Sequence, residues 1–172
     1  MDLIEYLIMN RKQAIDKWYK TIIDTYPMDS SKLFLGVNDK FANPVGYTFE
    51  KCLPEVFDNL VQGKAAIEIS GTFDEIIRLR AVQNFSPAEA TGFLFLLKNV
   101  VREMVADEEM DWDAKGLLKF ESEIDKSVSF CFDKYMDIKQ KLFEIKANEM
   151  KATFGRMRSE ERRVGKECRS RW

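Results

Sequence analysis

The sequence predicts an all-α protein, and three observations indicate that class. Apolar residues recur every three or four positions along most of the 172 residues, the spacing of helices that bury one face. Helix-start signals precede several of these segments. No stretch shows the alternation of apolar and polar residues that is typical of a half-buried strand. We expect a domain of about five to seven helices that ends in a long one.

The first expected helix begins at Asp2, which can cap it while Glu5 reaches back to the same turn. Its apolar positions keep helical spacing until Pro27, a residue that cannot continue a helix. The segment 28–42 has no clear period, so we expect a loop there, with room for a short helical turn.

The stretch "NPVGYTFE" predicts the start of a second helix, with Asn43 as its cap and Pro44 at its first position. Pro54 cannot donate a backbone hydrogen bond to the carbonyl of Glu50, so we expect a kink there. Gly63 is expected to end this helix.

The third expected helix begins at "TFDE", where Thr72 and Glu75 match a capping box, and ends near Asn84. Arg80 lies on its apolar side. A guanidinium in that position keeps its charge and needs acceptors, from a carboxylate or from the C-terminus of a helix. We interpret Arg80 as a tether between helices or as a ligand or partner contact, and Arg78 as solvated.

The fourth expected helix begins at "SPAE", where Ser86 caps, Pro87 takes the first position and Glu89 completes a capping box. Small residues at Ala88 and Gly92 would let another helix approach closely. An apolar face covers about half of its circumference, which is typical of a central core helix rather than of a surface helix. That face consists of Ala90, Phe93, Leu94, Leu97, Val100, Val101 and Met104.

The last expected helix starts near "DWDAKG" and runs to Phe154, with Gly155 as its stop. One apolar row with a seven-residue repeat would dock it on its own domain; this row is Leu117, Ile124, Cys131, Ile138 and Ile145. A second stripe appears later in the helix, and two stripes on one helix call for a second partner or for a chain that folds back over both. We predict a subunit or partner interface over 136–154, formed by Met136, Phe143, Ala147, Met150 and Phe154.

The last 17 residues, 156–172, differ from the rest because they lose the apolar periodicity. They resemble translated cloning-vector sequence, and we exclude them from the functional interpretation. The chain has 27 basic and 29 acidic residues and this tail holds 7 and 3 of them, so the remainder has a net charge of −6. An acidic domain is not expected to bind nucleic acid. With no long apolar run and no signal peptide, we expect a cytoplasmic protein without a membrane partner.

The absence of histidine narrows the chemistry, since histidine is the usual general base and the commonest metal and haem ligand. The carboxylates fall mostly at helix starts and on polar faces, where structural roles prevail. Cys52 and Cys131 lie within apolar stripes and are expected to be small core residues. We therefore expect no catalytic residues, no metal site and no cofactor.

Two segments, "NDKFANPVGYTFEKCLPEVFDNLVQG" and "RLRAVQNFSPAEATGFLFLLKNVVR", carry a resemblance to the RsbRD N-terminal domain family, the sensor half of stressosome co-antagonists. The resemblance covers roughly residues 10–110, and its marks are Asn43 to Gly46 and the run from Arg80 through Gln83 to Lys98. It implies a globin-like helical fold that usually lacks haem, a dimer, and sensory input passed through a projecting C-terminal helix. It also singles out Gln83 beside Arg80 as a contact residue.

Co-antagonists of this family continue into a STAS domain with phosphorylatable residues, whereas only the tail follows here. We therefore expect a sensor domain over 1–135, a helical extension over 136–155, and an action alone or on a separate partner. Two functions remain open at this stage. One is a non-catalytic regulatory module that binds a protein partner or a second copy of itself, with or without a small apolar ligand. The other is a small apolar ligand carrier or a carboxylate-based enzyme.

Overall fold

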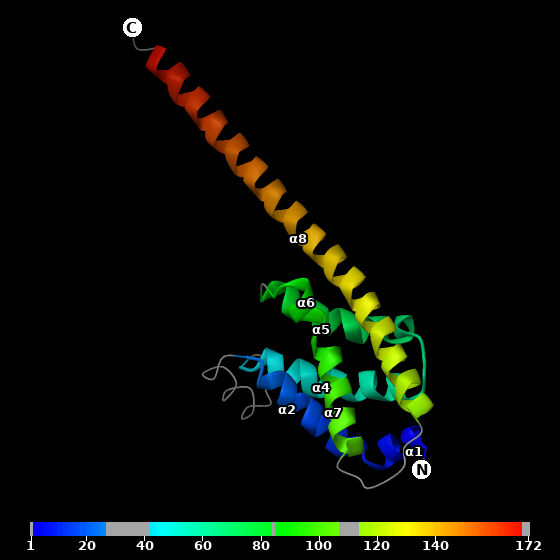
Figure 1. Cartoon of the computed structure of the whole chain (residues 1–172). Coiled ribbons are helices and arrows are strands. Elements are labelled where there is room, and N and C mark those ends of the chain that lie inside the picture. Colours follow the sequence, from blue (N-terminus) through cyan, green and yellow to red (C-terminus); the bar gives the residue numbers. More distant parts are fainter. Residues whose placement is uncertain (1, 27–41, 84, 107–113, 170–172) are drawn as a thin grey trace. The chain divides into compact units, whose positions relative to one another are not determined.

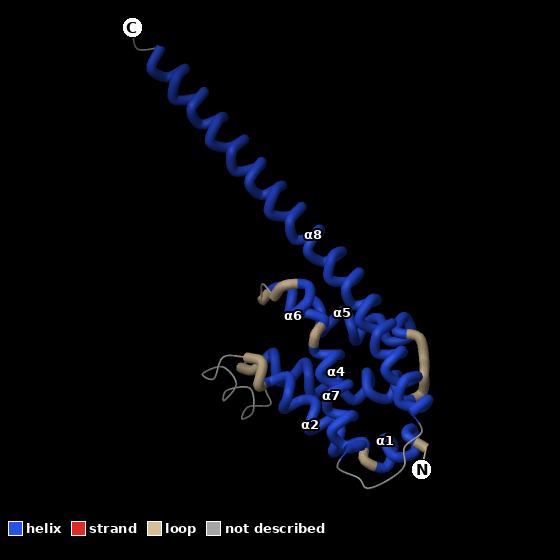
Figure 2. The backbone as a smooth tube through the Cα atoms, in the orientation of Figure 1, coloured by secondary structure: helices blue, strands red, loops and turns tan. Residues whose placement is uncertain are grey.

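The computed structural model describes residues 2–26, 42–83, 85–106 and 114–169, with side chains as far as residue 160. Within those ranges the chain forms seven α-helices, one short 3-10 helix and no strand (Figure 2). The all-α class is therefore confirmed. The expected loop over 28–42 lies almost wholly outside the described residues.

The N-terminal segment forms two helices, α1 (Leu3–Met9) and α2 (Arg11–Ile23), so the prediction of a single helix is wrong. Asp2 does cap α1, accepting from the backbone N–H of Ile4 at 3.2 Å. The break lies at Asn10, whose side-chain amide donates to the carbonyl of Tyr6 at 3.1 Å. An asparagine side chain that bonds a nearby backbone group competes with the helix, and this competition accounts for the interruption.

Helix α4 (Pro44–Val61) begins as predicted, because the Asn43 side chain accepts from the backbone N–H of Gly46 at 2.8 Å. The helix continues through Pro54. Gly63 follows its end with a φ of 63°, in the left-handed region that glycine enters without steric cost. The predicted helix boundaries are confirmed here.

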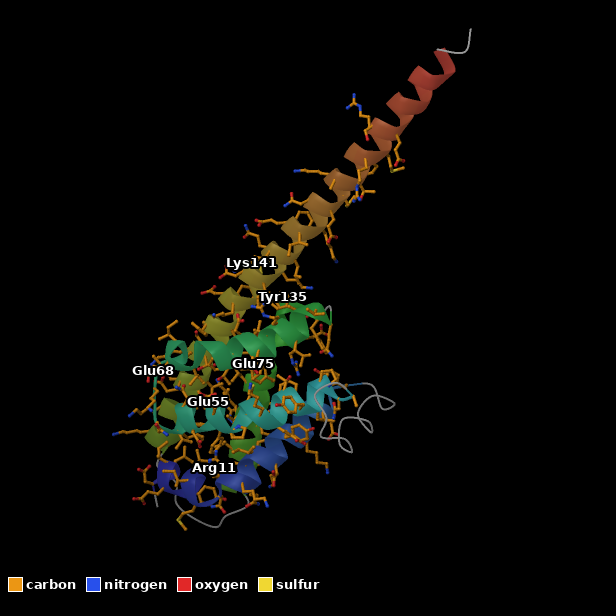
Figure 3. All side chains as sticks on the ribbon, turned by 180° about the vertical axis from the view of Figure 1, so that it is seen from behind. Arg11, Glu55, Glu68, Glu75, Tyr135 and Lys141 are labelled. Carbon is orange, nitrogen blue, oxygen red and sulfur yellow. The ribbon has the colours of Figure 1, made fainter. Side chains whose placement is uncertain are left out.

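A 3-10 turn, η1 (Ala66–Ile69), leads directly into α5 (Ser70–Val82), so the predicted start at Thr72 is wrong. The Thr72 hydroxyl donates to the carboxylate of Glu55 on α4. Glu75 accepts from Lys51 of the same helix at 2.8 Å. Both side chains of the expected capping box thus make contacts to α4 instead, and Figure 3 labels the two carboxylates Glu55 and Glu75.

Ser86 and Glu89 form the predicted capping box at the start of α6 (Pro87–Thr91). The single helix expected beyond it is interrupted at Gly92, after which α7 (Phe93–Ala106) begins. Gly92 has φ −60° and ψ −21°, close to 3-10 geometry. The Gly92 nitrogen still donates to the Ala88 carbonyl at 2.8 Å, the i to i−4 bond of an α-helix, so the interruption is confined to one residue.

The core lies between four helices of the first unit, with α4 packed on α2 and α5, and α2 packed on α7 (Figure 1). All seven residues of the apolar face predicted for 90–104 are buried, so α7 is confirmed as a core helix. Large side chains fill the space between these helices and are fully buried: Trp18, Phe49, Phe57, Phe73 and Phe93. The Trp18 indole N–H also donates to the carbonyl of Phe93 at 2.6 Å, joining α2 to α7.

The last helix, α8, spans Ala114–Arg169, so Gly155 does not end it. A Cβ at Gly155 would meet no atom within 4 Å, and one glycine inside a long helix costs only about 1 kcal/mol relative to alanine. The chain divides into two units, Met1–Tyr135 and Met136–Trp172. None of the described helices combines the length and apolar character that a bilayer span requires.

Candidate functional site

Arg80, on α5, is only 3% exposed, although arginine is seldom buried. Its Nη1 donates to the backbone carbonyl of Glu89 on α6 at 2.6 Å. Its guanidinium carbon lies 5.1 to 5.7 Å from the centres of four aromatic rings, within range of cation–π attraction. These rings belong to Tyr26, Phe49, Phe85 and Phe93.

Within the part of the chain that the structure describes, no carboxylate accepts a hydrogen bond from Arg80. The Glu89 carboxylate accepts instead from the backbone N–H and the hydroxyl of Ser86, both at 2.8 Å. Burial lowers the pKa of Arg80 from its ordinary value, and the Tyr26 phenol opposes that change. Because a guanidinium remains charged in proteins even so, Arg80 is a buried cation held by rings and a carbonyl.

A cavity of about 220 Å³ opens beside this cation. Arg80 and Phe93 are its buried lining residues, whereas Thr25 and Glu89 are exposed at its edge. The full lining is Thr25, Arg80, Phe85, Glu89, Gly92, Phe93 and Leu96. The cavity is therefore largely apolar and contains one cationic group.

Gln83, expected beside Arg80, is exposed, and its side-chain oxygen accepts from the Tyr26 hydroxyl at 3.3 Å. It reaches the arginine only through that tyrosine. Tyr135 of α8, labelled in Figure 3, donates its hydroxyl hydrogen to the carbonyl of Phe85. The last turn of α8 within the first unit is thereby bonded to a residue that lines the cavity.

The four aromatic residues around Arg80 were not identified from the sequence. Tyr26 follows the end of α2, Phe49 occupies an ordinary apolar position of α4, and Phe85 stands between two helices. Nothing in these positions distinguishes the four residues from other core aromatics. The hydroxyl contact of Tyr135 was also not anticipated from the sequence.

In the second unit, α8 carries an exposed apolar stripe. Met136, Phe143, Met150 and Phe154 have relative exposures from 50% to 74%, and Ala147 is partly exposed. Met136, Phe143 and Met150 are spaced by seven residues, and Met157, also exposed, continues the row. Ala147 and Phe154 stand four residues after members of that row, which is the spacing of a coiled-coil seam. Met157 was missed because the sequence interpretation excluded the tail.

The two cysteines whose side chains the structure describes, Cys52 and Cys131, are both buried. Burial raises the pKa of Cys52 to about 12, and the neighbouring Glu75 carboxylate adds to the rise. Burial also raises the pKa of Cys131 above its ordinary value. Thiols in this state are poor nucleophiles because the reactive form is the thiolate. No group of three or more acidic or cysteine side chains within the described ranges is placed to hold a metal ion.

Residues 12–150 match the family model described as the RsbT co-antagonist protein rsbRD N-terminal domain. The chain belongs to this family. The match extends beyond the roughly 10–110 expected from the motifs and includes α8 as far as Met150. Membership in the rsbRD N-terminal domain family indicates a regulatory module of the stressosome type.

An uncharacterized protein from Archaeoglobus fulgidus is 26% identical over 151 residues, which cover 87% of this chain and 91% of the relative. No solved structure shows a significant match to the chain.

Proposed function

We propose that this rsbRD N-terminal domain is a non-catalytic sensor and interaction module that passes a signal to a protein partner through α8. The observation that carries the proposal is the exposed stripe of Met136, Phe143 and Met150, in which large apolar side chains repeat every seven residues. A contiguous apolar stripe on an otherwise charged helix favours association with another helix. The occupant we propose is α8 of a second copy, because a heptad seam is complementary to itself.

A path for the signal runs through the first unit. The Tyr135 hydroxyl bonds the Phe85 carbonyl, and the Phe85 ring lies against Arg80. A change at the arginine cluster would therefore alter a contact of the last α8 residue in that unit. Such coupling requires two arrangements of these groups that a ligand or partner favours to different degrees.

The experiment that tests the association compares two exposed residues of the same helical turn. Phe143→Glu places a charge in the stripe and should weaken self-association in sedimentation equilibrium, because a carboxylate cannot be buried in an apolar seam without a partner. Lys141→Glu, at an exposed position outside the stripe and labelled in Figure 3, should leave it unchanged. A wild-type chain that is monomeric at every concentration, or equal effects of both substitutions, would contradict the proposed interface.

A further inference from the structure

Two nitrogens of Arg80 make no hydrogen bond of normal geometry to a described protein group. The Tyr26 phenol lies close enough to raise the pKa of Arg80 and is the competing acceptor within the protein. Nη1 bonds the Glu89 carbonyl, whereas Nε and Nη2 are buried without an acceptor. A buried N–H donor of a charged group that has no acceptor destabilises the folded protein, and such donors are rare in natural structures. Arg80 also lines the cavity. Nε and Nη2 themselves are buried, so a ligand in the cavity reaches them only when the side chains around the guanidinium shift.

The same two nitrogens bind carboxylates elsewhere in this protein. Arg11 uses Nε and Nη2 to bond both oxygens of Asp58, at 2.6 and 2.8 Å. Arg102 uses them to bond Glu121, at 2.6 and 2.9 Å. Nε and Nη2 form one edge of the planar guanidinium fork, which matches the two oxygens of a carboxylate. On Arg80 this edge is the part that remains without a partner.

The acid nearest to Arg80 along the cavity wall does not fill this role. The Glu89 carboxylate is held by Ser86 through two hydrogen bonds, as part of the capping box of α6. These bonds also lower the pKa of Glu89, so the carboxylate stays ionised while it is hydrogen-bonded to Ser86. Glu89 therefore does not occupy the Nε and Nη2 edge of Arg80, and no other carboxylate of the described residues bonds it.

The size and lining of the cavity define the rest of the ligand. A cavity of about 150 Å³ with an apolar lining holds a benzene molecule. The volume here is about 220 Å³, enough for a benzene-sized body and a small head group. Phe85, Phe93 and Leu96 supply apolar surface for that body.

We propose that this cavity binds a small monocarboxylate with an apolar body of about the size of benzoate. The carboxylate accepts from Nε and Nη2 of Arg80, and the apolar body packs against Phe85, Phe93 and Leu96. The inference rests on the proposed sensory role, since it names the chemical class of the signal. Tyr135 bonds the backbone of Phe85, so the ligand would act directly beside the contact of α8.

Isothermal titration of the full chain with three probes tests the chemistry of the site. Benzoate has the charge and the apolar body, benzamide has the same shape without charge, and sulfate has charge without an apolar body. We expect benzoate to bind about tenfold or more tightly than either comparison compound, because only it satisfies both parts of the cavity. Equal binding of benzamide would overturn the role of the charge, and equal binding of sulfate would overturn the role of the apolar lining.

Two variants locate the binding. Arg80→Met should weaken benzoate binding about tenfold or more, whereas Arg78→Met, an exposed arginine on the same helix, should leave it unchanged. Leu96→Trp fills the cavity and retains the guanidinium, so it should also abolish binding, and it decides the matter if Arg80→Met does not fold. Circular dichroism checks the fold of each variant.

Calorimetry detects benzoate binding whether or not the chain self-associates, so this proposal and the α8 interface can fail separately. Absence of benzoate binding by the wild type would overturn the ligand site and leave the interface untouched. Benzoate binding that persists in a folded Arg80→Met variant, or in Leu96→Trp, would likewise overturn the assignment of this cavity.

Discussion

The guanidinium of Arg80 and the backbone carbonyl of Glu89 are joined by a hydrogen bond of 2.6 Å that ties α5 to α6. Two residues earlier, Arg78 is exposed and pairs with Asp74 within its own helix at 2.8 Å. The two arginines therefore offer a matched comparison between a buried tether and a surface ion pair.

Arg80→Met should lower the free energy of unfolding by about 1 to 2 kcal/mol, because it removes a charged hydrogen bond and leaves the Glu89 carbonyl without its donor. Relief of the buried charge offsets part of that loss. Arg78→Met should stay within about 0.5 kcal/mol, as expected of an exposed pair. Urea denaturation of both variants measures the difference, and equal, negligible effects would contradict the tether.

Helix starts were predictable where the capping contact is local. Asn43 and Ser86 accept from backbone N–H groups three residues ahead. Both partners of each contact therefore lie within four consecutive residues, and the cap can be recognised from the sequence. Thr72 and Glu75 show the same local pattern, yet their side chains bond Glu55 and Lys51 of α4. Sequence spacing cannot reveal which of two partners, the local backbone or a distant helix, a side chain will meet.

The residues of the candidate site could also be predicted only in part from the sequence. Arg80 stood out because a charged residue on an apolar helix face contradicts the pattern around it. The rings of Tyr26 and Phe85 agree with their patterns, so nothing local distinguishes them. Their convergence on one guanidinium depends on how α2, α5 and α6 pack, which is a tertiary property.

Gly92→Ala should destabilise the fold. A Cβ at this position would lie 2.9 Å from the backbone oxygen of Ala88, closer than real contacts permit, and a backbone atom cannot rotate away. Overpacking of this kind costs about 1 to 3 kcal/mol. Gly71→Ala is the control, because a Cβ there meets nothing within 4 Å and should be neutral or mildly stabilising. Thermal unfolding of both variants tests the contrast, and similar midpoints would refute the steric argument.

The Ser86–Glu89 capping box predicts a pH dependence of stability. The hydrogen bonds from Ser86 lower the pKa of Glu89 below its ordinary value of 4.5 in the folded protein. A carboxyl with a depressed folded-state pKa stabilises fully above its unfolded pKa and loses that contribution as pH falls through the folded value. Wild type should therefore exceed Glu89→Gln in stability at pH 7, and the two should converge as the pH falls well below 4.5. Denaturation midpoints between these conditions provide the measurement, and a constant difference at all pH values would show that protonation of Glu89 is not involved.

Removal of the stripe on α8 tests the interface most directly. Phe120, Ile124 and Cys131 of α8 are buried in the first unit, and a chain that ends at Tyr135 retains them. Of the buried α8 residues it loses Ile138. It loses Met136, Phe143 and Met150, whose exposure is half or more of each residue. The truncated chain should keep its helical circular dichroism and become monomeric or less tightly associated, because the apolar surface for pairing is absent. Sedimentation equilibrium over a range of concentrations measures the association of both chains. If the two chains show the same state of association while the shorter one remains folded, residues 136–154 do not form the subunit interface, and α8 would have to act on a different protein.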